Sequence, residues 1–172
     1  MEAKARTAHL GDEHGFTLLE LGVSLLVIAV LVTMSLGAFR GAARAGELSS
    51  IRLRVTTALK AEMAMHVSSG VFLGTATEVR RATLTNEEPS LDWGSTSATN
   101  DQDVIARAGR LVVAGTMYRQ AWVCLEAVSP AGDHVAVAKV AIGPASGTYY
   151  GHGTTRLCRG LRSVTAWPTS SW

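Results

Sequence analysis

The longest uncharged stretch of the sequence most restricts how this chain folds. Residues 21–38 read LGVSLLVIAVLVTMSLGA, eighteen residues without Asp, Glu, Lys or Arg. As an α-helix they would extend about 27 Å, close to the roughly 30 Å hydrocarbon thickness of a bilayer. The alternative is a cleaved secretory signal, with Ser35, Gly37 and Ala38 as a weak cleavage site, but such signals have a shorter apolar core. The stretch therefore predicts a membrane-spanning helix.

The helix is expected to continue beyond the apolar stretch, because the next residues keep a helical period and no proline precedes Pro89. Five apolar residues recur at spacings of three and four, which is one face of a helix: Leu48, Ile51, Val55, Leu59 and Met63. Four charged residues are expected mostly on other faces: Arg44, Arg52, Lys60 and Glu62. The pattern predicts one long helix, membrane-embedded over residues 16–38 and amphipathic over residues 39–69, with Gly70 as its C-cap.

The rest of the chain predicts a small sheet. Residues 70–109 are expected to connect helix and sheet, with a short helix at 76–84 and a polar surface loop at 86–103 that Trp93 anchors. Strands are expected at 110–118, 121–129 and 134–143, with SPAGD at 129–133 as a hairpin turn, YYGHG at 149–153 as a turn, and SVTAW at 163–167 as a last strand. The expected fold class is α+β, with the C-terminal half of one long helix packed on an antiparallel sheet within residues 110–172.

The two cysteines of the chain, Cys124 and Cys158, both lie in the C-terminal part. Such a pair is most simply a disulfide made outside the cytoplasm, and two free buried cysteines are the alternative. The positive-inside rule points the other way, because only Lys4 and Arg6 precede the apolar stretch while four arginines follow it: Arg40, Arg44, Arg52 and Arg54. We expect the disulfide, and with it a C-terminal domain outside the cytoplasm.

The sequence offers little for catalysis or metal binding. It contains no GxSxG, HExxH or Walker lysine. It has no CxxC or Cys/His cluster with the spacing of a metal site, and its five histidines are dispersed. Glu126 is a general base only if a site exists that the sequence does not reveal. The formal net charge of +2, without a block of basic residues, argues against an obligate nucleic-acid binder. We expect no enzyme, no metal and no cofactor, and neither DNA nor a surface ligand is indicated.

Residues 15–31, GFTLLELGVSLLVIAVL, resemble the N terminus of type IV pilins and pseudopilins, with glycine, aromatic, TLLE and apolar run in register. The resemblance implies a leader of residues 1–15 that a prepilin peptidase cuts between Gly15 and Phe16, and it implies N-methylation of Phe16. WVCLEAV at 122–128 and GTYYGHGTTRLC at 147–158 are similar to the C-terminal cysteine loop of pilins from Gram-positive bacteria.

The resemblance also implies a role for Glu20. A carboxylate near the start of a membrane helix is costly unless it is paired, and in this family the glutamate is taken to meet the N-terminal amine of a neighbouring subunit. Here that amine would belong to Phe16 of the next subunit. The alternative is a carboxylate that lies at the level of the lipid headgroups. Glu20 is thus the candidate assembly residue.

The expected function is that of a structural subunit of a type IV pilus or related filament. The implied partners are other pilin subunits, prepilin peptidase, an inner-membrane assembly platform, and membrane lipid before assembly. The chain would cross the cytoplasmic membrane once and then enter an extracellular filament. Two alternatives stay open: a pseudopilin of a type II secretion or DNA-uptake machine, and an uncleaved bitopic protein with an adhesive or binding module outside.

Overall fold

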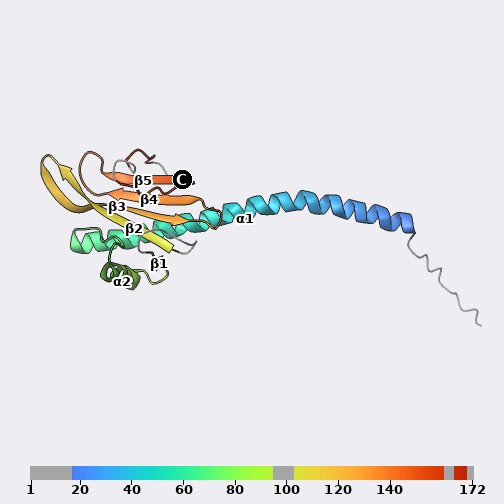
Figure 1. Ribbon diagram of the computed structural model, residues 1–172, viewed down its shortest axis with the longest axis horizontal. Helices are drawn as coiled ribbons and strands as arrows, with labels where there is room; N and C mark the ends of the chain where they lie inside the picture. Colours follow the sequence, from blue (N-terminus) through green and yellow to red (C-terminus); the bar gives the residue numbers. More distant parts are fainter. Residues whose placement is uncertain (1–16, 95–102, 161–164, 170–172) are drawn as a thin grey trace, which may run out of the picture. The chain divides into compact units, whose positions relative to one another are not determined.

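The computed structural model describes residues 17–94, 103–160 and 165–169. It confirms an α+β arrangement like that of a pilin, in which a long N-terminal apolar helix packs against a five-stranded sheet (Figure 1). The elements in chain order are α1 (Leu18–Ser69), α2 (Glu78–Glu87), β1 (Asp92–Trp93), β2 (Asp103–Val113), β3 (Thr116–Val128), β4 (His134–Val140) and β5 (Gly147–Gly153). The chain divides into two compact units, Met1–Gly41 and Ala42–Trp172.

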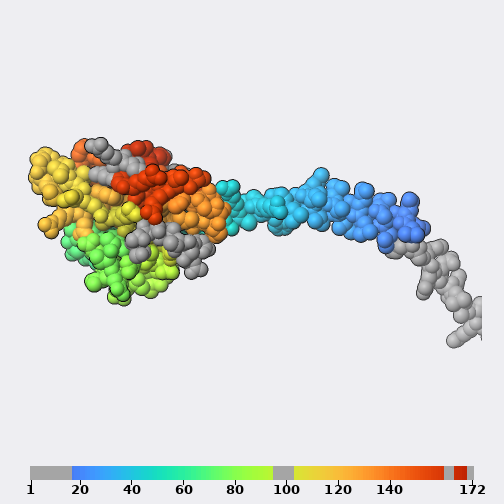
Figure 2. Space-filling view, viewed as in Figure 1, coloured from blue at the N-terminus to red at the C-terminus, as the bar shows by residue number. Residues whose placement is uncertain are grey.

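The first unit consists of the apolar start of α1 as far as the structure describes it. Every residue from 18 to 41 is exposed, and Figure 2 draws this part of the helix in blue. Most of its large exposed side chains are apolar. By length and composition the helix can cross a membrane. Nothing in the described part of the unit buries these side chains, because a single helix has no second apolar surface to pack against.

In the second unit, which we call the C-terminal domain, the end of α1 packs on one face of the sheet. The shared core joins helix residues to β2, β3 and β4: Ile51, Val55, Ala58, Leu59, Val104, Ala106, Val123, Leu125, Val135 and Val137. Leu48 packs at its margin, as predicted. The predicted helix face is wrong at its last turn, because Met63 is 41% exposed whereas Glu62 is completely buried.

The sheet has the strand order β1-β2-β3-β4-β5 and is mixed (Figure 1). The four longer strands pair antiparallel, as predicted. β1 instead runs parallel to the start of β2, pairing Asp92 with Asp103 and Trp93 with Val104, so the prediction of a wholly antiparallel sheet is corrected. Burial accounts for this short strand, because the Trp93 ring belongs to the core beneath α1 and carries its backbone to the edge of the sheet.

The strand predicted at 110–118 is wrong, because the chain reverses inside it. β2 ends at Val113 and β3 begins at Thr116, and the two residues between them, Ala114 and Gly115, have φ of 48° and 83°. Two successive positive φ angles match the right-handed twist of a hairpin. Alanine seldom adopts such an angle, so the sequence did not predict this turn. The SPAGD turn, in contrast, is confirmed by Gly132, with φ of 84°, and by the Ser129 N–H donating to the Asp133 carbonyl over 2.8 Å.

The predicted turn at 149–153 is also wrong, since these residues pair with β4 as part of β5. Gly151 is needed there for space, because a Cβ atom would lie 3.0 Å from the indole of Trp167. A glycine inside a strand commonly marks such a close approach. Of the strand predicted at 163–167, residues 165–167 form a turn or bend and the first two lie outside the described residues.

The region after α1 is more structured than the connection predicted over 70–109. Gly70 follows the helix with φ of 76°, as expected of its C-cap. The short helix is confirmed as α2, whose N-cap Thr77 accepts the Arg80 N–H. β1 and the first part of β2 also fall within this region. In the predicted surface loop, Leu91 and Trp93 are buried, which confirms Trp93 as an anchor, while residues 95–102 lie outside the described part.

Candidate assembly site and the C-terminal domain

The predicted cleavage site lies outside the described residues. Gly15 and Phe16 both precede Thr17, where the described chain begins. Their cutting and methylation remain predictions from the sequence.

Glu20, the predicted assembly residue, has a local partner in Thr17. The Glu20 N–H donates to Thr17 Oγ1 over 3.2 Å, and the Thr17 N–H and hydroxyl lie 3.4 and 3.3 Å from Glu20 Oε2. This reciprocal pair is a capping box, which satisfies N–H groups that a helix start leaves open. The capping box was not predicted, although Thr-x-x-Glu is its signature. Glu20 is also exposed, so its carboxylate is open to a second partner.

The hydroxyl groups of the apolar stretch are satisfied within the helix. Ser24 Oγ donates to the Glu20 carbonyl, Thr33 Oγ1 to the Val30 carbonyl and Ser35 Oγ to the Leu31 carbonyl, each over 2.8 Å. A hydroxyl bonded to its own helix backbone needs no water. The stretch can therefore enter an apolar environment without leaving these groups unpaired.

The predicted disulfide is confirmed. Cys124 on β3 and Cys158 in the C-terminal segment, residues 154–160, are bonded, with their Cα atoms 5.7 Å apart and both side chains fully buried. The alternative of two free cysteines is therefore wrong.

Glu126 lies on the same face of β3 as Cys124 and is almost completely buried. Its Oε1 accepts the Leu157 N–H over 2.9 Å and its Oε2 accepts the Cys158 N–H over 3.0 Å. His134 Nδ1 lies 2.6 Å from Oε1. Both carboxylate oxygens therefore accept hydrogen bonds from the protein itself. This carboxylate anchors the C-terminal segment to the sheet, which is a structural role.

The face of the sheet opposite α1 carries a second, smaller core. It unites strand residues with the C-terminal part of the chain: Trp122, Cys124, Ala136, Ala138, Val140, Tyr149 and Cys158, with Leu111, Leu157 and Trp167 at its margin. The Tyr150 N–H donates to the Pro168 carbonyl over 3.0 Å. Both faces are thus covered, which explains why seven successive residues of β3, 121–127, are all buried.

Glu62, near the end of α1, is a second buried carboxylate. Its two oxygens accept the Leu73 N–H over 2.9 Å and the Gly74 N–H over 2.8 Å. Burial raises the pKa of Glu62 above its ordinary value of 4.5, although the two N–H bonds and the nearby Arg80 charge act in the opposite direction. The carboxylate fixes the chain where it turns back from α1 toward the sheet.

One ion pair joins α1 to the turn between β3 and β4. Arg44 Nη2 lies 2.9 Å from Asp133 Oδ2, and Asp133 also accepts from Arg44 Nε over 3.3 Å. The arginine side chain is 63% exposed and the carboxylate 4%. This contact keeps the first turn of the C-terminal domain's helix against the sheet, which the sequence did not reveal.

No metal site is found among the described residues, where no three His, Cys, Asp or Glu side chains form a group suited to a metal ion. The described site residues are Glu20, at the start of the apolar stretch, and the bonded pair Cys124 and Cys158 in the C-terminal domain. No known protein family, curated protein or solved structure matches this chain.

Proposed function

We propose that this chain is a structural subunit of a type IV pilus or a related filament. The observation that carries the proposal is an exposed, apolar, capped helix start in a chain whose remainder forms one disulfide-closed α+β domain. A helix covered all round by apolar side chains needs either lipid or other apolar helices as surroundings. A filament built from such subunits offers lipid before assembly and neighbouring helices after it.

In this proposal residues 16–38 anchor the subunit in the cytoplasmic membrane and the C-terminal domain lies outside. The disulfide supports this orientation, because such bonds persist in oxidising compartments. A prepilin peptidase cuts before Phe16 on the cytoplasmic side, and an assembly platform in the membrane then transfers the subunit to the filament.

In this proposal the Glu20 carboxylate has two successive roles, one in the single subunit and one during assembly. In a single subunit the capping box with Thr17 satisfies the helix start. During assembly the exposed carboxylate attracts the Phe16 amine of an adjoining subunit, since a charge in an apolar core is stabilised by a partner of opposite sign. The capping box keeps the carboxylate at the helix end while that partner approaches.

The mass of the mature protein tests the processing step. The chain extracted from membranes should begin at Phe16 and carry one added methyl group, as intact-mass spectrometry would measure. A membrane-extracted chain that still carries residues 1–15 would contradict processing and favour the bitopic alternative. Cleavage near Ala38 would instead identify an ordinary secretory signal.

Variants of the capping box test the assembly step. Glu20→Ala removes both the charge and the cap, Glu20→Gln keeps a capping side chain without the charge, and Thr17→Val removes the cap but keeps the charge. We expect all three to be inserted and cut. We expect both Glu20 variants to be depleted from sheared surface filaments and Thr17→Val to be incorporated.

Comparison of cleaved subunit in the membrane with subunit in the filament gives the readout. Normal incorporation of Glu20→Gln would show that the charge is dispensable and that the residue acts as a cap. Loss of cleavage in either Glu20 variant would move the role of this residue to peptidase recognition. Cleaved wild-type protein without surface filaments would favour the pseudopilin alternative.

A further inference from the structure

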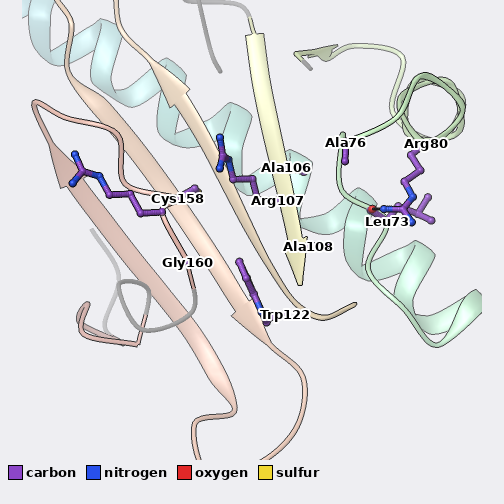
Figure 3. A pocket seen from close by; sticks show the side chains of 10 residues that line it. Leu73, Ala76, Arg80, Ala106, Arg107, Ala108, Trp122, Cys158 and Gly160 are labelled. Atoms are coloured by element: carbon purple, nitrogen blue, oxygen red, sulfur yellow. Dashed lines mark hydrogen bonds between the residues drawn. The ribbon is translucent and has the colours of Figure 1, made fainter. Parts of the chain in front are cut away.

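A groove of about 440 Å³ runs across the β2 edge of the C-terminal domain. In Figure 3, Leu73, Ala76 and Arg80 lie on one side of it, Cys158 and Gly160 of the C-terminal segment lie on the other, and Arg107 and Trp122 lie between. The neighbouring Arg159 also lines it. The groove thus brings guanidinium groups together from three separate parts of the chain.

A second groove of about 460 Å³ adjoins the first and continues toward the β2–β3 hairpin. The two share Arg80 and Ala108, and the second adds Arg110 and Arg119. Among the residues that the structure describes, no Asp or Glu lines either groove. Arg110, Arg119 and Arg159 are all exposed. Arg107 already has a partner within the protein, so a ligand would be held by the other arginines.

Both walls of the first groove are held by buried carboxylates. Glu62 binds the N–H groups of Leu73 and Gly74 on the wall that carries Arg80. On the opposite wall, Glu126 and the disulfide hold Cys158, the residue before Arg159. The separation of the two walls is therefore fixed by the fold before any ligand arrives, which lowers the entropic cost of binding.

Arg80 is itself positioned. Its Nη1 donates to the Leu73 carbonyl over 3.1 Å. When the Gln120 amide is oriented with its oxygen toward the guanidinium, Nη1 and Nη2 donate to that oxygen over 2.8 and 2.9 Å. Arg80 lies where the two grooves meet, and these hydrogen bonds fix its position. Because Glu62 already offsets part of the Arg80 charge, the exposed arginines supply most of the positive charge of the grooves.

Small residues of β2 also line the grooves: Ala106 and Ala108 the first, Ala108 and Gly109 the second. β2 reads Ala-Arg-Ala-Gly-Arg over residues 106–110, so alanine or glycine lies between the arginines. At Gly109 a Cβ atom would lie 2.5 Å from the Trp122 indole, whose Nε1 donates to the Arg110 carbonyl. The indole therefore occupies the space beside Gly109, and Trp122 as a whole is 9% exposed. Ala108 lines both grooves, and its methyl side chain leaves a ligand room beside the arginines.

We propose that the two grooves together bind an acidic polysaccharide, with one carboxylated sugar in each groove. Guanidinium groups recognise carboxylates through paired, charge-assisted hydrogen bonds. Each cavity is of the size that takes a small ligand, and two in a row suit a polymer with one anionic group per repeat. The inference goes beyond the filament proposal and does not depend on cleavage or assembly.

Nucleic acid fits these grooves less well. Proteins that hold single strands stack bases on exposed aromatic rings. Of the described residues that line either groove, Trp122 is the sole aromatic one, and it is only 9% exposed. The formal net charge of +2 for the chain is also small for a protein that follows a nucleic-acid backbone.

Binding of the full-length chain in a nonionic detergent to polygalacturonate, a polymer of one carboxylated sugar, tests the proposal. The variant Arg110→Gln/Arg159→Gln removes one exposed arginine from each groove. The matched control, Lys60→Gln/Arg156→Gln, removes two exposed charges that line neither groove. We expect affinity at least about tenfold weaker for the groove variant and within about twofold of wild type for the control, with no binding to neutral dextran.

Four outcomes would overturn the proposal. If the wild-type protein does not bind polygalacturonate, the proposed ligand is wrong. If the groove variant binds it with wild-type affinity, the proposed site is wrong. Equal weakening by both variants would show diffuse surface charge without a groove. Tighter binding of duplex DNA or polyphosphate at equal anion concentration, lost in the groove variant alone, would reassign the site to phosphate ligands. Intact disulfide and unchanged thermal unfolding in both variants confirm that the affinities report binding.

Discussion

Glu62 and Glu126 are two buried carboxylates with the same task and different support. Each accepts hydrogen bonds from two backbone N–H groups of a segment that folds back onto it. Glu62 accepts from Leu73 and Gly74. Glu126 accepts from Leu157 and Cys158. Glu62 closes a loop of 11 or 12 residues, and the nearby Arg80 charge supports it further. Glu126 closes a span of 31 or 32 residues and has His134 and a disulfide beside it.

The difference follows from the entropy of loop closure. Closing the longer span costs about 1 kcal/mol more than closing the shorter one. A buried carboxylate by itself is weak evidence for stability, because desolvation opposes its hydrogen bonds. The longer span therefore has covalent reinforcement, whereas the shorter one depends on hydrogen bonds. Since these two segments form the walls of the arginine groove, the wall that carries Cys158 is expected to be the more rigid one.

Removal of the disulfide should have the largest effect on stability. We expect Cys124→Ser/Cys158→Ser to lower the free energy of unfolding of the C-terminal domain by about 4 kcal/mol, from the loop entropy of the unfolded chain. Urea unfolding followed by tryptophan fluorescence would measure it. In the wild-type protein, alkylation without prior reduction should label neither cysteine. Labelling of both in freshly made protein would contradict the disulfide and the location outside the cytoplasm that it supports.

Glu126→Ala should come next, with a loss of about 3 kcal/mol while the disulfide stays intact. The variant leaves the buried N–H of Cys158, the partly buried N–H of Leu157 and His134 without their acceptor, and such unpaired groups are costly. Glu126→Gln should lose less, because the amide oxygen still accepts one bond. Glu87→Ala, which removes an exposed carboxylate on α2, is the control and should change stability by less than about 0.5 kcal/mol. A Glu126→Ala protein as stable as this control would show that the disulfide alone holds the segment.

Glu62→Ala should lower stability by about 2 kcal/mol, less than Glu126→Ala. It unpairs the N–H groups of Leu73 and Gly74, but it also removes a charge whose burial was unfavourable. The same urea measurement applies, and amide hydrogen exchange at Leu73 and Gly74 should become faster. An increase in stability would mean that desolvation of the carboxylate outweighs its two hydrogen bonds.

The smallest effect should be the pH dependence that Glu62 contributes. Because burial raises the pKa of Glu62 above 4.5 in the folded protein, the native state binds this proton more readily than the unfolded chain. The resulting stabilisation is fully present below pH 4.5 and is lost as the pH rises through the raised pKa. We expect the stability of wild type relative to Glu62→Gln to fall with rising pH in that window. A constant difference between the two proteins would contradict the raised pKa.

Several features were predictable because their causes lie close together in the sequence. The buried helix face at Ile51, Val55 and Leu59 follows from helical spacing, and the turn at 129–133 follows from its proline and glycine. The disulfide followed from the presence of only two cysteines in one domain. The capping box was also predictable, because Thr17 and Glu20 have its Thr-x-x-Glu spacing, although it was not predicted.

The missed features depend on residues that meet only after folding. Burial of Glu62 requires N–H donors from Leu73 and Gly74, which the helix period does not reveal, so Glu62 was expected on another face of the helix. Gly151 reads as a turn residue until Trp167 is found to occupy the space of its missing side chain. The reversal at Ala114 and Gly115 follows from strand pairing, which holds an alanine at a φ that it seldom adopts.

The sequence by itself determined the long apolar helix, the amphipathic continuation and the cysteine pair, because each depends on residue type and local spacing. Only the tertiary structure decided the mixed sheet, the two buried carboxylates and the convergence of Arg80, Arg110, Arg119 and Arg159 on adjoining grooves. These arginines are dispersed in the sequence and carry no common motif. Pairing of β2 with β3 brings Arg110 and Arg119 together, and Glu62 and Glu126, with the disulfide, hold the segments that carry Arg80 and Arg159 against the same edge of the sheet.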